Sequence, residues 1–348
     1  MTRVRIAVAG AGTIGSRHIE EVDACESTAL ASIVDPGTAG RELAAKFGVE
    51  RYVSLAQLFA TDRPDGVILA TPNRMHVDGG LECVAAGVPV IVEKPIGVDV
   101  GSATRLVEAG EAAGVPVLTG HHRTYSPILA KAREIIQSGC LGTLVGISGT
   151  ALFCNPDDCF DAGAGWRQEP GGEPILLNLT HQVTTLLSLV GDITTVMAVT
   201  SNPTGGSPTE ASSAMIFQFS NGALGTFLLL DAAAAARSWE QTSAESSGFA
   251  NYGDADAYHI VGKRGSLSMP TMRMTTYESQ RLRWQPLATP AHTANGSDPL
   301  ISQLMHFADV IRGRAQPICS GREALKTMQV VDAVVESARI GQPVNIAV

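Results

Sequence analysis

The sequence predicts an α/β domain built on a doubly wound parallel sheet, followed by an α+β domain. The chain has 348 residues, more than a single hydrophobic core usually serves, so we expect two domains. Up to about residue 120, short apolar runs alternate with helical stretches, as in parallel strands joined by crossover helices. Beyond about residue 125, apolar and polar residues alternate with the period of half-buried antiparallel strands. We therefore expect one domain over residues 1–124 and a second over residues 125–348.

In the first domain, the apolar runs mark the expected strands. They lie within residues 4–9, 30–34, 66–72, 88–95 and 115–120. A helix is expected to follow the first strand from Ile14 onward, and another to end at Gly87. A further helix is expected from Asp99, a residue suited to an N-cap, to Gly114, which can end a helix.

In the second domain, a helix is expected from Pro127 to Ser138. Asn221-Gly222 stands between two alternating segments, which strongly indicates a β-hairpin. Apolar residues return at helical spacing within residues 300–313 and 320–341. Residues 232–257, rich in Ala, Ser and Gly, are expected to be irregular.

The loop after the first strand, GAGTIG, carries the dinucleotide-binding pattern G-x-G-x-x-G. Gly10 permits a tight turn, Gly12 lets the backbone approach a pyrophosphate, and Gly15 lets helix and strand pack closely. Thr13 and Ile14 begin the helix, whose free N–H groups and positive dipole end would bind the pyrophosphate. A G-x-G-x-x-G pattern between a strand and a helix is called a Rossmann fingerprint. Because the pattern has that setting here, we expect it to hold a dinucleotide.

An acid stands where such a fingerprint requires one. Asp35 ends the second apolar run, 20 residues after Gly15. Its carboxylate would accept hydrogen bonds from the adenosine ribose and repel a 2′-phosphate. Pro36 and Gly37 follow, so the nearest cation is Arg41. We expect NAD rather than NADP.

Composition excludes several other classes of partner. The net charge is −9 and there is no basic stripe, which argues against nucleic acid. The six cysteines are scattered, and the closest pair, Cys154 and Cys159, lacks two further ligands nearby, so no metal site is expected. No apolar run approaches the roughly 20 residues of a membrane span, and no signal peptide is apparent. We expect a soluble, cytoplasmic protein.

Ligands of doubly wound sheets bind beyond the carboxyl ends of the strands. Lys94, in the tripeptide Glu93-Lys94-Pro95, stands at such an end, where its ammonium could hold a substrate hydroxyl or alkoxide. Farther along, Asn178 and His181 form a polar pair on one face of an otherwise apolar helix. Histidine suits proton exchange near neutral pH.

Taken in order, several motifs resemble those of the Gfo/Idh/MocA oxidoreductases. They are GAGTIG, Asp35, ATPNRMH (70–76), EKP (93–95), GHHRTYSP (120–127) and the helix that carries His181. The resemblance extends over nearly the whole chain. It implies a Rossmann domain and a C-terminal domain with a large, mostly antiparallel sheet through which the chain would form dimers or tetramers.

The resemblance also implies roles for individual residues in a hydride transfer from the carbinol carbon of a sugar, cyclitol or related hydroxy compound. His181 would be the general base, and Lys94 would orient the hydroxyl and help to place the nicotinamide. The remaining expected cofactor contacts are Thr71, Pro72, Asn73, His76 and Glu93. The expected substrate contacts are Arg123, Trp166, Arg167, Asn178 and His181.

The chain departs from the family's pattern on the His181 helix. Many members carry an Asp four residues before the histidine and another three after it, where this chain has Leu177 and Thr184. Asn178 could orient the imidazole but cannot stabilise an imidazolium as a carboxylate does. Either His181 acts with the support of Asn178, or the substrate supplies an acid that Arg123 or Arg167 binds. Two alternatives therefore remain beside the dehydrogenase: an NAD-binding regulatory protein, and a glycoside hydrolase that uses NAD transiently.

Overall fold

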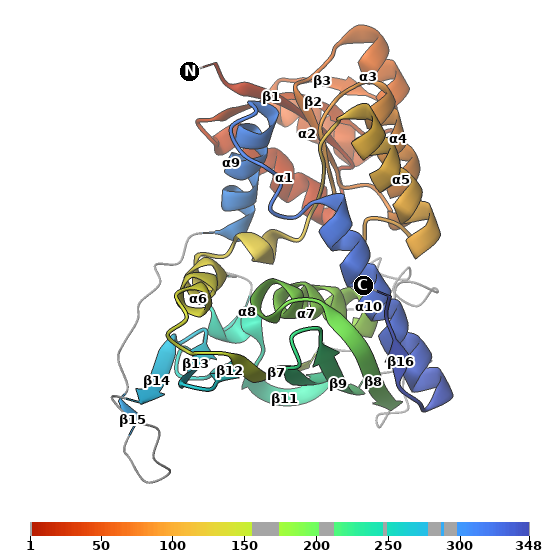
Figure 1. The fold of residues 1–348 in the computed structure, drawn as a ribbon. Helices are drawn as coiled ribbons and strands as arrows, with labels where there is room; N and C mark the ends of the chain where they lie inside the picture. The colour runs from red at the N-terminus through yellow and green to blue at the C-terminus, as the bar shows by residue number, and fades with distance from the viewer. Residues whose placement is uncertain are drawn as a thin grey trace. The chain divides into compact units, whose positions relative to one another are not determined.

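The computed structural model describes residues 2–154, 174–201, 212–245, 249–277, 287–288 and 298–347 (Figure 1). The chain forms two compact units. The first unit comprises Met1–Tyr125 and Pro299–Met328, and the second comprises Ser126–Asp298 and Gln329–Val348. Within the described ranges, no helix is long and apolar enough to cross a membrane.

The first unit contains a six-stranded parallel sheet in the order β3-β2-β1-β4-β5-β6. Its strands are β1 (Val4–Ala9), β2 (Thr28–Val34), β3 (Glu50–Tyr52), β4 (Gly66–Leu69), β5 (Val90–Val92) and β6 (Val117–Thr119). This strand order is that of the dinucleotide-binding Rossmann fold. It confirms the doubly wound α/β class expected from the alternation of apolar runs and helical stretches.

Both faces of the central part of this sheet are buried, which explains why β4, β5 and most of β1 are apolar runs, whereas the edge strand β3 is not. Along β1, Ile6 and Val8 belong to one core cluster, and Ala7 and Ala9 belong to the other. Up to Tyr125 the helices of this unit are α1 (Thr13–Ala24), α2 (Thr38–Phe47), α3 (Leu55–Thr61), α4 (His76–Ala85), α5 (Val100–Ala113) and the short 3₁₀ turns η1 (Asn73–Met75) and η2 (His122–Tyr125).

Helix α5 begins and ends at the capping residues expected from the sequence. The Asp99 carboxylate accepts a hydrogen bond from the Ser102 N–H, with 2.7 Å between Oδ1 and N. Gly114 ends the helix in the left-handed conformation, at φ +66°. Both positions match the expected N-cap and stop.

The C-terminal helices differ from the expected division at residues 124 and 125. Helix α9 (Pro299–Ile311) belongs to the first unit, where Leu304, Phe307 and Ala308 join the cluster of Ile6 and Val8. Helix α10 (Gly321–Ile340) begins in the first unit and continues into the second. The physical reason is burial: the apolar face of α9 covers a sheet face that the first 125 residues do not cover alone.

The second unit contains a ten-stranded sheet among its described residues. Its strands are β7 (Leu144–Cys154), β8 (Ile193–Ser201), β9 (Ser212–Phe219), β10 (Leu224–Leu230), β11 (Ala232–Arg237), β12 (Tyr258–Gly262), β13 (Gly265–Met269), β14 (Arg273–Tyr277), β15 (Leu287–Ala288) and β16 (Val344–Asn345). All pairings are antiparallel except that of β7 with β10. The hairpin at Asn221-Gly222 joins β9 to β10, as expected.

Residues 232–257 are more regular than their composition suggests. Strand β11 pairs with β7, and a short helix α8 (Trp239–Thr242) follows it. The expectation of an irregular segment was wrong for residues 232–242, because pairing with β7 gives a strand to an alanine run that has no strand pattern of its own. The described residues between 243 and 257 form neither helix nor strand, as expected.

One face of the second sheet packs against α6 (Pro127–Gln137) and α7 (Pro174–Val190). Leu129, Leu179 and Val183 from these helices share a core with Phe217 of β9 and Phe227 of β10. On the opposite face, the following apolar side chains remain exposed: Met197, Val199, Ile216, Leu224 and Leu228. We call these five residues the open apolar face. Met197 lies directly opposite Ile216 in the pairing of β8 with β9.

Candidate functional site

The three glycines of the first loop have different surroundings. A Cβ on Gly10, whose φ is +99°, would lie 2.3 Å from the Ala70 carbonyl oxygen, and one on Gly15 would lie 2.1 Å from the Gly10 oxygen. A Cβ on Gly12 would meet no protein atom within 4 Å. Gly12 is also the N-cap of α1, and as a glycine it has no side chain to cap the helix. Gly10 and Gly15 therefore pack against the protein backbone, whereas the space beside Gly12 is free, which fits the close approach of a pyrophosphate.

Asp35 is fixed beside this loop by hydrogen bonds to both of its carboxylate oxygens. Oδ2 accepts from the Ala11 N–H at 2.9 Å, and Oδ1 accepts from the Gly37 N–H at 2.7 Å. The carboxylate thus lies where the first two strands end, as the fingerprint requires. This arrangement fits recognition of the adenosine ribose.

An arginine that the sequence did not single out lies on the same turn. Nη1 of Arg51, on β3, donates to the carbonyl oxygens of Asp35, Pro36 and Gly37 at 3.1, 3.3 and 3.4 Å. Arg41, the cation expected to be nearest, is exposed on α2. The pairing of β3 with β2 brings Arg51 there, so only the strand order could have indicated it.

The turn after β4 is linked to the EKP turn by one imidazole. His76 is buried, with Nδ1 2.7 Å from the Pro95 carbonyl oxygen and Nε2 2.8 Å from that of Thr71. Pro72 and Asn73 lie between Thr71 and His76 in the same turn. The structure therefore brings together two segments that are separate in sequence and that were both expected to line the cofactor.

Glu93 is buried at the end of β5. Its Oε1 lies 2.8 Å from Nε2 of His18, which is on the buried side of α1. Its Oε2 accepts from the Lys94 N–H at 3.2 Å. A Cβ on Gly120 would lie 2.5 Å from Oε1, so the carboxylate requires a glycine at that position. Lys94 itself is half-buried.

Charges gather at the ends of β5 and β6. Burial acts to raise the pKa of Glu93, but the hydrogen bond from His18 and the charges of His18, His122 and Lys94 hold it below its ordinary value. Burial, together with Lys94, lowers the pKa of His121 to about 3. Burial likewise lowers the pKa of His122 to about 4. At neutral pH the ionised carboxylate of Glu93 and the neutral imidazoles of His121 and His122 therefore lie beside Lys94. Arg123, also buried, follows in η2.

The second unit carries His181 and Asn178 on α7, both half-buried. The Thr185 hydroxyl donates to the His181 carbonyl oxygen at 2.9 Å. Next to His181, the buried Gln182 accepts a hydrogen bond from the Tyr258 hydroxyl of β12, which joins α7 to the sheet. Thr184, in place of the family acid, donates its hydroxyl to the Thr180 carbonyl oxygen at 2.8 Å.

Some expected site residues cannot be placed. Trp166 and Arg167 lie outside the described residues, and so does the side chain of Leu177. The first unit brings together the expected cofactor residues, Lys94 and Arg123, whereas Asn178 and His181 belong to the second unit. Among the described residues, no group of His, Cys, Asp and Glu side chains could hold a metal ion.

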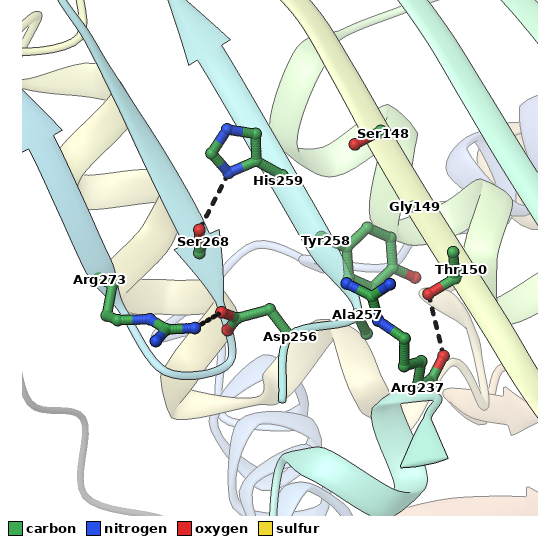
Figure 2. A pocket seen from close by; sticks show the side chains of 10 residues that line it. All are labelled: Ser148, Gly149, Thr150, Arg237, Asp256, Ala257, Tyr258, His259, Ser268 and Arg273. Carbon is green, nitrogen blue, oxygen red and sulfur yellow. Dashed lines mark hydrogen bonds and ion pairs between the residues drawn. The ribbon is translucent and has the colours of Figure 1, made fainter. Parts of the chain in front are cut away.

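The second unit also has a pocket of about 350 Å³ (Figure 2). Its lining residues are Ser148, Gly149, Thr150, Arg237, Asp256, Ala257, Tyr258, His259, Ser268 and Arg273. His259 is paired with both Ser148 and Ser268 across the sheet, whereas its neighbour Tyr258 belongs to the core. The pocket is therefore on the same side of the sheet as the open apolar face. None of the expected site residues that the structure describes lines it.

Relatives of known sequence support the interpretation of the motifs. The chain is 32% identical over 148 residues to the rhizopine catabolism protein MocA of Rhizobium meliloti, covering 42% of this chain and 47% of that protein. It is 26% identical over 361 residues to an inositol 2-dehydrogenase of Rubrobacter xylanophilus, covering 98% of this chain and 92% of that protein. The first of these matches spans about half the length of the curated relative.

Solved structures show the same fold. The WlbA dehydrogenase from Bordetella pertussis, in complex with NADH and UDP-GlcNAcA, superposes with a TM-score of 0.78 at 21% identity and covers 100% of both chains. An oxidoreductase from Agrobacterium radiobacter, in complex with NAD⁺, L-tartaric acid and magnesium, gives 0.77 at 20% identity, covering 99% of this chain and 98% of that one.

Family models match both units. The model described as an oxidoreductase family with an NAD-binding Rossmann fold matches residues 4–121, and that of the Gfo/Idh/MocA C-terminal domain matches residues 129–268. These matches confirm the resemblance inferred from the spaced motifs. The chain belongs to the Gfo/Idh/MocA oxidoreductases, and residues 4–121 are their NAD-binding Rossmann domain.

Proposed function

We propose that the chain is an NAD-dependent dehydrogenase that oxidises a carbinol carbon of a small polyhydroxylated compound. The observation that carries this proposal is the open backbone at Gly12 beside the fixed carboxylate of Asp35. This pair fits a dinucleotide whose adenosine ribose has no 2′-phosphate. When bound, NAD supplies the acceptor for the hydride that leaves the carbinol carbon.

The residues of the first unit bind and orient the cofactor in this proposal. Gly10, Gly12, Thr13, Ile14 and Gly15 surround the pyrophosphate, and α1 directs its N-terminal N–H groups at it. Asp35 accepts hydrogen bonds from the ribose hydroxyls. The turn from Thr71 to His76, with Glu93 and Lys94, borders the nicotinamide.

Lys94 orients the substrate. Its ammonium donates to the hydroxyl that is oxidised and stabilises the negative charge that builds on that oxygen as its proton leaves. The partial burial of Lys94 supports this role, because a charge acts more strongly where water is scarce.

His181 is the general base that takes the hydroxyl proton. Asn178, one helical turn away on α7, orients its imidazole. Arg123, Trp166 and Arg167 contact the other hydroxyl or acidic groups of the substrate. The hydroxyl of Thr184 donates to the Thr180 carbonyl oxygen within the helix.

The names of the relatives support a cyclitol or sugar as the substrate class. Several curated relatives are inositol 2-dehydrogenases, including one from Corynebacterium glutamicum that is 30% identical over 157 residues. A carboxylated substrate is the alternative, because Arg123 and Arg167 could bind an acid.

The test is an assay of the purified protein with NAD, and separately with NADP, against cyclitols, sugars, sugar acids and diol acids. Formation of reduced cofactor with one class, lost at least 100-fold in Lys94→Ala and in His181→Ala, is expected. Tight NAD binding without turnover on any compound would favour a regulatory protein. Cleavage of a glycoside with no net NADH would favour a hydrolase that uses NAD transiently.

We further propose that the chain forms a dimer or tetramer through the second sheet. The five residues of the open apolar face support this, because a contiguous exposed apolar patch commonly marks a protein interface. Thr226 lies opposite Ile216 on one side and Ser148 on the other, so the same row continues to the pocket of Figure 2. A second copy could therefore bury apolar and polar side chains together.

A further inference from the structure

We infer that His18 is a positioning residue for Lys94, acting through the buried carboxylate of Glu93. The inference rests on the proposed function, in which Lys94 orients the substrate hydroxyl. It concerns a histidine of α1, the helix that follows the glycine loop, and so connects the two parts of the first unit that were expected to serve the cofactor.

The first step is the contact between His18 and Glu93. Their side chains are only 4% and 8% exposed, and 2.8 Å separates Nε2 from Oε1. Since water is excluded, the imidazole is the partner that satisfies this carboxylate oxygen. A buried carboxylate that loses its partner is strongly destabilised, so the pair is fixed rather than optional.

The second step is that Glu93 has little room to move. Its backbone N–H donates to the Leu69 carbonyl oxygen at 2.9 Å, within the parallel sheet. Its carboxylate lies against Gly120, where a Cβ would come within 2.5 Å of Oε1. A carboxylate held by the sheet on one side and by His18 on the other has one orientation.

The third step transmits that orientation to Lys94. The second carboxylate oxygen, Oε2, accepts from the Lys94 N–H at 3.2 Å. One residue beyond Lys94, the Pro95 carbonyl oxygen lies 2.7 Å from Nδ1 of His76. The backbone is thus held on both sides of Lys94, by His18 through Glu93 and by His76 through the Pro95 carbonyl group.

The charges around Glu93 agree with this arrangement. The hydrogen bond from His18 and the charge of Lys94 favour the ionised form of this carboxylate. Removal of His18 would take away a hydrogen bond to Oε1 and would leave the carboxylate to reorient toward Lys94 or His122. In either case the Lys94 backbone loses a fixed contact.

The test is a double-mutant cycle with the substrate identified by the assay above. We expect His18→Leu to lower kcat at least tenfold while the Kd of NADH changes less than threefold. We expect His18→Gln, whose amide can still donate to Glu93, to recover most of that loss. In the Lys94→Ala background, we expect His18→Leu to change kcat less than twofold, because the group it positions is gone.

A second readout does not depend on turnover. The rate at which acetic anhydride modifies Lys94, followed by mass spectrometry, reports the surroundings of its amino group. We expect this rate to change at least threefold in His18→Leu and less than twofold in His18→Gln. Lys131 of the second unit, which pairs with Glu134, is the internal control. If His18→Leu does not fold, Glu93→Gln, which keeps the volume and removes the charge, takes its place.

The outcomes separate the two proposals. If Lys94→Ala is as active as the wild type, the proposed function is wrong, whatever His18 does. If Lys94→Ala is impaired but His18→Leu costs the same factor in both backgrounds, the positioning role is wrong. An unchanged rate of Lys94 modification in His18→Leu would also overturn it.

Discussion

Oδ2 of Asp35 accepts a hydrogen bond from the backbone N–H of Ala11, with 2.9 Å between the two atoms. Asp35, which follows β2, therefore stabilises the glycine loop that follows β1. Since Ala11 lies between Gly10 and Gly12, the group proposed to bind the ribose also shapes the loop proposed to bind the pyrophosphate. Substitutions at Asp35 should therefore keep an acceptor for this bond.

Asp35→Asn is expected to shift the preference from NAD toward NADP at least tenfold. The amide oxygen can still accept from the loop, but the charge that repels a 2′-phosphate is gone. A hydrogen bond to a charged group contributes about 1.5–3 kcal/mol, which is roughly a tenfold to hundredfold change in affinity. Arg51, held on the carbonyls of residues 35–37, remains as a nearby cation.

The measurement is the Kd of NAD and of NADP by calorimetry. Glu42→Gln is the matched control, because Glu42 is an exposed acid on the adjacent helix α2. It removes the same charge without touching the loop. An equal loss of affinity for both dinucleotides in Asp35→Asn would contradict the assignment of Asp35 to ribose recognition.

Gly12→Ala and Gly10→Ala are expected to fail in different ways. A methyl group on Gly12 meets nothing within 4 Å beyond its chain neighbours, so the unfolding free energy without cofactor should fall by only about 1 kcal/mol or less, the cost of alanine at an N-cap. The same methyl group would occupy the space proposed for the pyrophosphate, so NAD binding should weaken at least tenfold. Gly10→Ala would place Cβ 2.3 Å from the Ala70 oxygen at φ +99°, and should lower the unfolding free energy by about 2 kcal/mol or more.

Urea denaturation of the two variants, with and without NAD, distinguishes these effects. The wild type should be stabilised by NAD, and Gly12→Ala should be stabilised less at the same NAD concentration. If Gly12→Ala binds NAD as the wild type does, the open backbone at Gly12 is not the cofactor site.

Short sequence motifs correctly predicted the features that depend on a few consecutive residues. The glycine loop, the Asp99 cap and the Asn221-Gly222 hairpin each depend on a few consecutive residues, and each was found where expected. The apolar runs likewise predicted five of the six strands of the parallel sheet, because a strand buried on both faces is mostly apolar. They missed β3, whose residues Glu50, Arg51 and Tyr52 form no apolar run.

Contacts between distant segments were not predictable in this way. His18 and Glu93 are 75 residues apart, and only the packing of α1 against the sheet brings them together. The apolar face of a helix such as α9 indicates that the helix packs against a hydrophobic core, but it does not indicate which of two cores. The place of α9 in the first unit was therefore not predicted. The pairing of β11 with β7 is of the same kind, because an alanine run has no pattern that favours a strand.

His121→Gln is expected to reduce the dependence of stability on pH. The pKa of His121 is lowered from 6.5 to about 3 in the folded chain, with burial the main cause. Between these values the unfolded chain binds a proton that the folded chain does not. The unfolding free energy should therefore fall as the pH falls below about 6.5, by about 1.4 kcal/mol per pH unit for this group.

Chemical denaturation followed by far-ultraviolet circular dichroism at pH 7, 6 and 5 measures this slope. His122 contributes in the same direction, so a reduced slope should remain in His121→Gln. His259→Gln is the control, because His259 is exposed in the second unit, and it should leave the wild-type slope unchanged. An unchanged slope in His121→Gln would mean that this imidazole is not held neutral in the folded chain.

Ile216→Asp is expected to convert the proposed oligomer into a monomer. Ile216 is 53% exposed, and its neighbour across the sheet, Met197, belongs to the same open apolar face. If a second copy covers this face, the substitution buries an unpaired carboxylate in the interface, which is costly, whereas in the monomer the carboxylate stays in water. Val53→Asp, at a similarly exposed apolar residue of the first unit, should leave the oligomer intact. Light scattering coupled to size-exclusion chromatography gives the mass of each species. A wild type that is monomeric, or an Ile216→Asp variant of unchanged mass, would show that the chain does not associate through this face.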